Sequence, residues 1–121
     1  MNIHESAEDY LEAILRLRES KGYVRSVDIS QMLGVTKPSV SFAMKKLREN
    51  GYIHMAEDNL ITLTETGEQI ALRVYDRHKT IMSFLVSIGV SEETAREDAC
   101  KIEHDISEES FMALQRQLLR I

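Results

Sequence analysis

The pattern of apolar positions predicts a helix at the start of the chain. In residues 6–19, Tyr10, Ile14 and Leu17 recur at helical spacing and form one apolar stripe. Gly22 follows and is expected to end this helix.

Two shorter amphipathic segments come next and are joined by a glycine. Ser26 is the expected N-cap of a helix over 27–33, which Gly34 ends. Thr36 is the expected N-cap of a helix over 37–50. The inward side of that helix consists of Val40, Ala43, Met44 and Leu47. Two short helices joined in this way predict a helix-turn-helix.

The pattern then changes from helical to strand-like. Residues 52–55 and 60–63 are rich in apolar and β-branched side chains, and the polar residues 56–59 separate them. This arrangement predicts a β-hairpin, which would be the wing of a winged helix.

Three further helices are predicted, over 65–88, 92–104 and 108–119. A hydroxyl residue precedes each of them as its expected N-cap: Thr64, Ser91 and Ser107. The predicted fold class is therefore mainly α. An N-terminal winged helix-turn-helix (1–64) is followed by an α-helical domain (65–121).

Composition is that of a folded globular protein. The 121 residues are 43% hydrophobic and 29% charged, and there is one cysteine. No apolar run is long enough to cross a bilayer, and the first residues lack the features of a signal peptide. We therefore expect a cytoplasmic protein with no membrane partner.

Charge is distributed unevenly along the chain. The net charge is −5, but between Arg16 and Arg48 eight basic residues face two acids, Glu19 and Asp28. Acids dominate between Glu92 and Glu109. One part of the protein is thus suited to phosphates, while another is suited to cations.

The helix-turn-helix supplies the candidate DNA-binding residues. Its hydroxyls would bond phosphates or base edges, and its lysines would neutralise phosphates. Phe42 would either contact thymine methyl groups or pack within the protein. The candidates are Thr36, Lys37, Pro38, Ser39, Ser41, Phe42, Lys45 and Lys46.

Three ligand-type side chains lie close together near the C-terminus. Cys100, Glu103 and His104 share one face if the helix continues through them, because their spacing is i, i+3 and i+4. Asp9 and Glu12 are likewise three residues apart on the first helix.

With His78 on the long helix, six side chains could bind a transition metal. They are Asp9, Glu12, His78, Cys100, Glu103 and His104. The carboxylates suit Mn²⁺ or Fe²⁺, and the thiolate suits Fe²⁺, Co²⁺ or Zn²⁺. A solvated acidic face would equally explain the acids of the first helix, and a buried core histidine would explain His78.

The sequence resembles the diphtheria toxin repressor and manganese transport regulator family over essentially its whole length. The segments that carry the resemblance are Glu8-Asp9-Tyr10-Leu11-Glu12, Thr36-Lys37-Pro38-Ser39-Val40, Leu63-Thr64-Glu65-Thr66-Gly67, Arg77-His78 and Cys100-Lys101-Ile102-Glu103-His104. The resemblance implies a winged helix, a helical dimerisation domain and a site for a divalent metal.

By position, five of the six candidates match ligands of the manganese-responsive branch. Cys100 instead matches the iron-responsive branch, which has Met where this chain has Asp9. Arg96 and Met82 occupy two positions of that branch's ancillary metal site, so the resemblance implies no such second site. Because the sequence stops after the helical region, the SH3-like third domain of longer relatives is expected to be absent. Mn²⁺ or Fe²⁺ is the expected metal, with Co²⁺ or Zn²⁺ binding in vitro and no organic cofactor.

These observations predict a metal-dependent transcriptional repressor, and its expected targets are metal-uptake genes. Clustered carboxylates repel one another without metal, whereas a cation would fix the dimer with its two recognition helices about one DNA turn (~34 Å) apart, as operator DNA requires. The last two helices are expected to form the homodimer through Ile102, Ile106, Phe111, Leu114 and Leu118.

Other functions are compatible with parts of this pattern. A winged-helix regulator could be metal-independent, or it could sense redox state through Cys100. An enzyme is not expected, since the chain has no HExxH pattern, nucleophile elbow or phosphate-cradling glycine loop.

Overall fold

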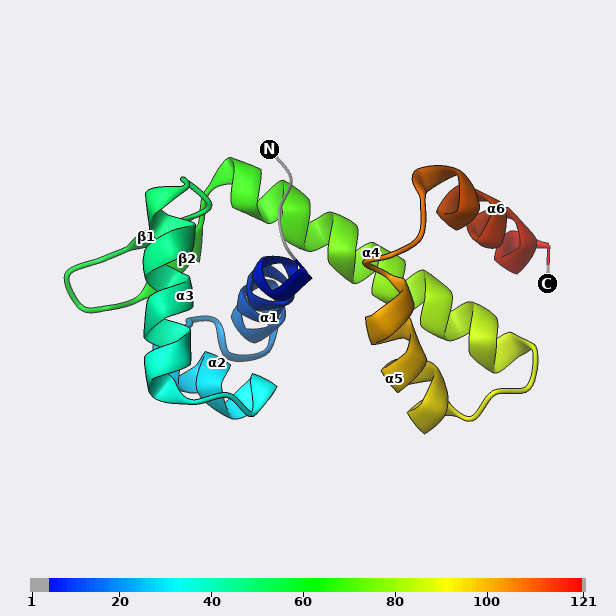
Figure 1. The fold of residues 1–121 in the computed structure, drawn as a ribbon, viewed down its shortest axis with the longest axis horizontal. Coiled ribbons are helices and arrows are strands. Elements are labelled where there is room, and N and C mark those ends of the chain that lie inside the picture. The colour runs from blue at the N-terminus through cyan, green and yellow to red at the C-terminus, as the bar shows by residue number, and fades with distance from the viewer. Residues whose placement is uncertain (1–4, 121) are drawn as a thin grey trace. The chain divides into compact units, whose positions relative to one another are not determined.

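The computed structural model describes residues 5–120, and its elements follow the predicted order (Figure 1). The chain divides into two compact units between Leu72 and Arg73. The first unit comprises α1 (Glu5–Lys21), α2 (Ser26–Leu33), α3 (Lys37–Glu49), β1 (Ile53–Met55), β2 (Ile61–Leu63) and the start of α4 (Glu65–Ser87). The second comprises the rest of α4, α5 (Glu92–Ile102) and α6 (Glu108–Leu119). The predicted fold class is confirmed.

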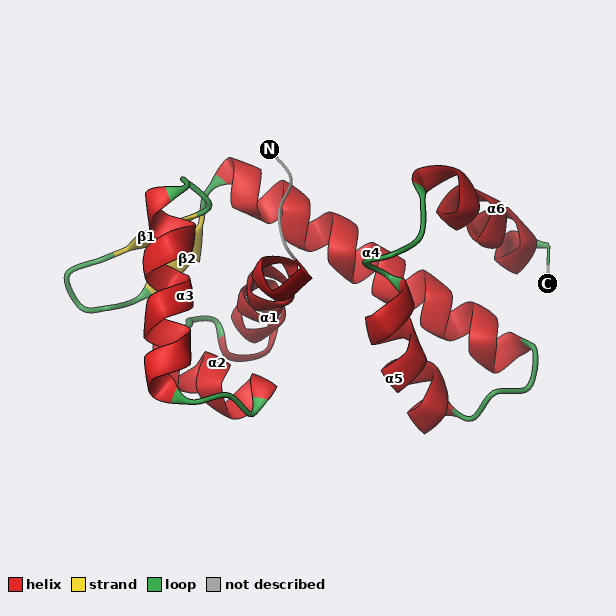
Figure 2. Cartoon of the chain, viewed as in Figure 1, coloured by secondary structure: helices red, strands yellow, loops and turns green. Residues whose placement is uncertain are grey.

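The first unit is a winged helix. Its three helices pack on one another, while β1 lies against α3 and β2 against α1. The strands form a short antiparallel ladder in which Ile53 pairs with Leu63 and Met55 with Ile61 (Figure 2). The largest fully buried side chains of this unit are Leu11, Ile14, Leu15, Val24, Ile29, Val40, Met44 and Ile53.

Local hydrogen bonds fix the turn between α2 and α3. Gly34 has the left-handed conformation, with φ of 67°, which glycine adopts without steric cost. The Ser30 hydroxyl donates to the carbonyl of Val35 at 2.6 Å. Thr36 then caps α3, because its Oγ1 accepts the backbone N–H of Ser39, as expected. The turn therefore holds the start of α3 in a defined position.

The expected N-cap of α2 was wrong by one residue. The helix begins at Ser26, so Arg25 is the N-cap. The reason is Asp28, whose Oδ2 accepts the backbone N–H of Arg25 at 2.9 Å. The same carboxylate pairs with Lys21 Nζ at 2.5 Å, and this hydrogen bond holds the pKa of Asp28 below its ordinary value.

The first turn of α4 touches the backbone that leads into the wing. Thr64 caps α4 by accepting the N–H of Gly67, and its own N–H donates to the carbonyl of Tyr52 at 3.1 Å. A Cβ at position 67 would lie 2.0 Å from that same carbonyl oxygen. Glycine is thus required here by close packing.

The second unit has its own small core. Ile81, Ala99 and Phe111 are buried at its centre, one from each helix. Partly buried side chains surround them: Met82, Leu85, Ile102, Ile106 and Leu114. Within residues 5–120, every helix is too short or too polar to traverse a bilayer.

Candidate metal centre and nucleic-acid interface

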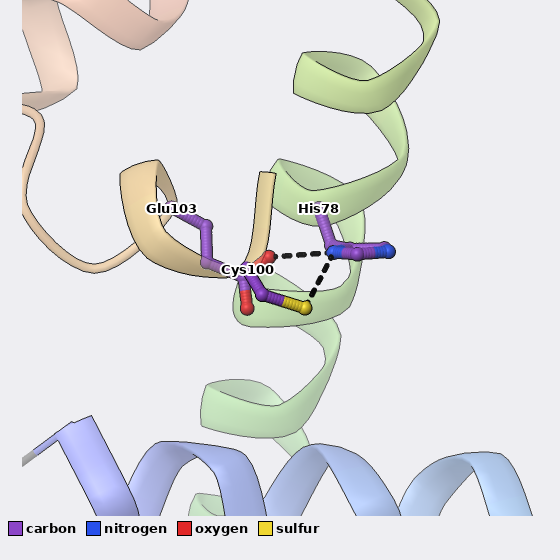
Figure 3. A group of neighbouring side chains, drawn as sticks. All are labelled: His78, Cys100 and Glu103. Carbon is purple, nitrogen blue, oxygen red and sulfur yellow. Dashed lines mark hydrogen bonds and ion pairs between the residues drawn. The ribbon is translucent and has the colours of Figure 1, made fainter. Parts of the chain in front are cut away.

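In the second unit, an imidazole, a thiol and a carboxylate point toward one another (Figure 3). Nδ1 of His78, on α4, lies 3.0 Å from Oε2 of Glu103 and 3.7 Å from Sγ of Cys100. The three ligand atoms lie within 4.8 Å of one another. His78 and Glu103 are buried, whereas Cys100 is exposed.

Glu103 is the centre of this group. Its side chain has no solvent exposure, and its second oxygen, Oε1, is buried and takes part in no hydrogen bond within the described part of the chain. Nε2 of His104 lies 3.4 Å from Oε1. A buried carboxylate without a full set of hydrogen bonds is costly. Nitrogen, sulfur and oxygen donors gathered around it fit a divalent transition metal.

The expected helix through these residues was too long. It ends at Ile102, so Glu103 is the C-cap of α5 and His104 lies in the following turn. Glu103 keeps helical angles, and its N–H donates to the carbonyl of Ala99 at 3.0 Å. Its side chain therefore still projects beside Cys100, as the helical spacing predicted.

The remaining two candidates lie on α1, in the first unit. Glu12 is buried, and Asp9 is partly buried. A buried carboxylate is unusual on an amphipathic helix, where acids normally face solvent. The alternative explanation for Asp9 and Glu12 was an acidic face exposed to solvent. Glu12 does not fit this alternative, because its side chain is buried.

The structure gives a contact at this site to one residue for which the sequence predicted no role. Arg77 precedes His78 on α4, and its Nη1 donates to the backbone carbonyl of Glu103 at 3.2 Å. Nothing in the local sequence indicates this contact, because the two residues are 26 positions apart.

The candidate DNA-binding residues all lie on the surface. All eight side chains between Thr36 and Lys46 that were predicted to contact DNA are exposed, and the Phe42 side chain is 64% exposed. The opposite face of α3 is buried through Val40, Met44 and Leu47. The exposed face also carries Lys46, whose Nζ lies 5.4 Å from the centre of the Phe42 ring. A basic helix with an outward face of this kind suits the major groove.

A winged helix with an exposed basic helix, followed by a unit in which side chains of metal-binding types cluster, is typical of a metal-responsive DNA-binding regulator. Residues 2–59 match the N-terminal DNA-binding domain of iron-dependent repressors. Residues 64–121 match the metal-binding and dimerisation domain of the same proteins. The chain belongs to the iron-dependent repressor family, which confirms the resemblance seen in the sequence.

Individual relatives agree with this assignment. An uncharacterised HTH-type transcriptional regulator of Methanocaldococcus jannaschii is 40% identical over 113 residues, which are 92% of this chain and 90% of the relative. The transcriptional regulator MntR of Escherichia coli O6:H1 is 39% identical over 111 residues, covering 92% of this chain and 72% of that protein.

A solved structure of a manganese-dependent transcriptional repressor in complex with manganese is 30% identical, with a TM-score of 0.83. The match covers 93% of this chain, which spans about half (52%) of that protein. The family consists of repressors that bind DNA and metal as dimers and are not enzymes, so the predicted functional class is confirmed.

Proposed function

We propose that this chain represses metal-uptake genes as a homodimer that binds operator DNA when Mn²⁺ or Fe²⁺ is bound. One observation carries the proposal: the buried carboxylate of Glu103 lies between two imidazoles and beside a thiol, in the domain that binds metal in this family. A repressor of this kind would act in the cytoplasm, where its operator DNA lies.

The proposed ligands and domains follow the sequence prediction. We propose residues 1–64 as the DNA-binding domain and 65–121 as the metal-binding and dimerisation domain, a division near the boundary between the two family matches. The proposed metal ligands are Asp9, Glu12, His78, Cys100, Glu103 and His104. The proposed DNA contacts are Thr36, Lys37, Pro38, Ser39, Ser41, Phe42, Lys45 and Lys46.

The donor set supports both Mn²⁺ and Fe²⁺. Carboxylates and imidazoles suit Mn²⁺, and the manganese-bound repressor that this chain resembles supports that metal. The thiol of Cys100 favours Fe²⁺ and, in vitro, Co²⁺ or Zn²⁺. Air-free titration is therefore needed to compare these ions.

The role of the protein residues follows from charge. Without metal, the carboxylates of Asp9, Glu12 and Glu103 carry like charges that oppose their convergence. A bound divalent cation would offset this repulsion. Because the proposed ligands come from both domains, their convergence would favour one arrangement of the dimer's recognition helices, and thereby raise affinity for an operator of matching spacing.

The test measures DNA affinity as a function of metal. Duplexes selected from a randomised library with Mn²⁺-loaded protein are labelled, and binding is followed by fluorescence anisotropy with Mn²⁺, Fe²⁺, Co²⁺, Zn²⁺ or a chelator. We expect metal to tighten binding by about 5–150-fold, the usual range of allosteric coupling. Unchanged affinity after chelation would contradict the proposal.

Matched variants separate the site from general charge effects. Glu103→Gln keeps the size of the side chain but removes its charge, and should abolish most of the metal response. Glu109→Gln removes an exposed acid on α6 and should leave the response intact. If chelation has no effect but peroxide releases DNA from the wild type and not from Cys100→Ser, the chain is a redox sensor instead.

A further inference from the structure

Arg77, on α4, contacts the turn between α5 and α6 through both of its Nη atoms. Its side chain is only 13% exposed. Nη1 donates to the carbonyl oxygens of Glu103 at 3.2 Å and of Ile106 at 3.0 Å, and Nη2 donates to Oε2 of Glu108 at 2.7 Å. The guanidinium also lies over the ring of Phe111, 5.3 Å from its centre. One side chain thus holds the turn between α5 and α6 from both ends.

That turn carries two of the proposed metal ligands. The carbonyls at a helix C-terminus have no partner within the helix and need other donors. Arg77 supplies donors to the carbonyl of Glu103 and to that of Ile106, three residues further on. His104 lies between them, so its backbone is held at both sides.

Arg77 is also the chain neighbour of a third ligand. His78 follows it on α4, and the Nδ1 atom of His78 faces the carboxylate of Glu103. The same helical turn therefore holds the backbone of Glu103 through the guanidinium and meets its side chain through the imidazole. A guanidinium suits this role because its donors have a fixed planar geometry.

We infer that Arg77 is a positioning residue of the metal centre, which sets the placement of Glu103 and His104 relative to His78. This inference rests on the proposed metal site but adds a residue that is not itself a ligand. Groups that orient ligands typically contribute about 10–100-fold to metal affinity. A residue that only stabilises the fold would change melting without changing the metal's affinity or spectrum.

Cobalt binding to the full-length protein provides the test. Co²⁺ is titrated anaerobically into the wild type and Arg77→Met, which keeps the apolar stem and removes every donor. Absorption of the Co²⁺ complex reports both affinity and ligand geometry. We expect Arg77→Met to bind Co²⁺ about 10–100-fold more weakly and with an altered visible spectrum. Arg77→Lys, which retains the charge but lacks the planar fork, should fall between the two.

Two further variants control for lost charge and lost stability. Lys79→Met removes an exposed cation from the same helix, and Glu108→Gln removes the exposed partner of Nη2 while leaving the two carbonyl contacts. Both should bind Co²⁺ as the wild type does. Circular dichroism checks that each protein is folded, and if Arg77→Met is unfolded, the Arg77→Lys titration decides.

The outcomes distinguish this inference from the proposed function. Wild-type protein that does not bind Co²⁺ would overturn the metal site and the inference together. Wild-type binding that is matched by the folded Arg77 variants, in affinity and in spectrum, would overturn the inference alone.

Discussion

Phe42 is a large aromatic residue whose exposure stability does not explain. It lies two positions from both Val40 and Met44, which are buried, and so projects from the opposite side of α3. Leaving an aromatic ring 64% exposed forgoes the gain of burying it. The ring is flanked by Lys46, whose charge suits DNA phosphates. Contact with a thymine methyl group would explain both features.

Replacing thymine by uracil tests this contact, since it removes only the methyl group. With each thymine of a selected operator replaced in turn, we expect one position per half-site to weaken wild-type binding by about fourfold, the value of one buried methyl group (about 0.8 kcal/mol). Phe42→Ala should bind the thymine duplex and the uracil-substituted duplex equally. Phe42→Leu should retain part of the wild-type preference for thymine. Anisotropy titrations would show the contact to be absent if the wild type is insensitive at every thymine.

Asp28 should give the first unit a pH-dependent contribution to stability. Its hydrogen bond with Lys21 lowers the pKa of the carboxyl below 3.8 in the folded protein. A lowered folded-state pKa means that the stabilisation is present above 3.8 and is lost as pH falls through the folded value. Asp28→Asn should therefore have a lower urea midpoint than wild type at pH 6–8, and the difference should shrink toward pH 3. The exposed Glu57→Gln variant serves as control and should show no such trend.

For single residues, the sequence indicated which side chains could bind metal, but it did not indicate which of them contact one another. The six ligand-type side chains could be found from spacing and resemblance, and the burial of Glu103 agrees with a role beyond solvation. The pairing of Glu103 with His78 could not be read from the chain, because it depends on how α4 and α5 pack. The contacts of Arg77 were not predicted for the same reason: its acceptors are mostly backbone carbonyls, which every residue has.

Among the elements, helix starts were predicted well where the cap is local. Thr36, Ser91 and Ser107 each accept the backbone N–H three residues later, so the signal lies within four residues. The start of α2 was misplaced because Asp28 accepts the backbone N–H of Arg25, which makes Arg25 rather than Ser26 the N-cap. The end of α5 was misplaced because no glycine follows, and because the carbonyl of Glu103 is bonded by a distant arginine.

The contact between α4 and the backbone before β1 gives an element-level prediction. In an exposed helix, Gly→Ala stabilises by about 1 kcal/mol. At Gly67 the added Cβ would lie 2.0 Å from the carbonyl oxygen of Tyr52, so Gly67→Ala should instead destabilise by about 1–3 kcal/mol. Urea unfolding measures the change. Thr66→Ala, at the exposed neighbouring position, should lie within about 0.5 kcal/mol of wild type; equal effects at both positions would contradict the steric explanation.

At the scale of the whole molecule, the sequence predicted that basic and acidic residues gather in different parts of the protein. The basic stretch from Arg16 to Arg48 falls in the winged helix, and the acidic stretch from Glu92 to Glu109 falls in the helical unit. The net charge of −5 conceals this separation. The long helix α4 contributes residues to both units, which no composition shift along the chain would indicate.

The apolar side chains left exposed in the second unit make repression depend on the concentration of the protein. Ile88, Met112 and Leu119 remain open to solvent in one subunit, and in this family the domain that holds them forms dimers. When copies are too scarce to pair, the amount of dimer grows with the square of the copy number. Halving the amount of protein would then reduce promoter occupancy about fourfold. Small changes in expression of the protein would therefore cause larger changes in repression.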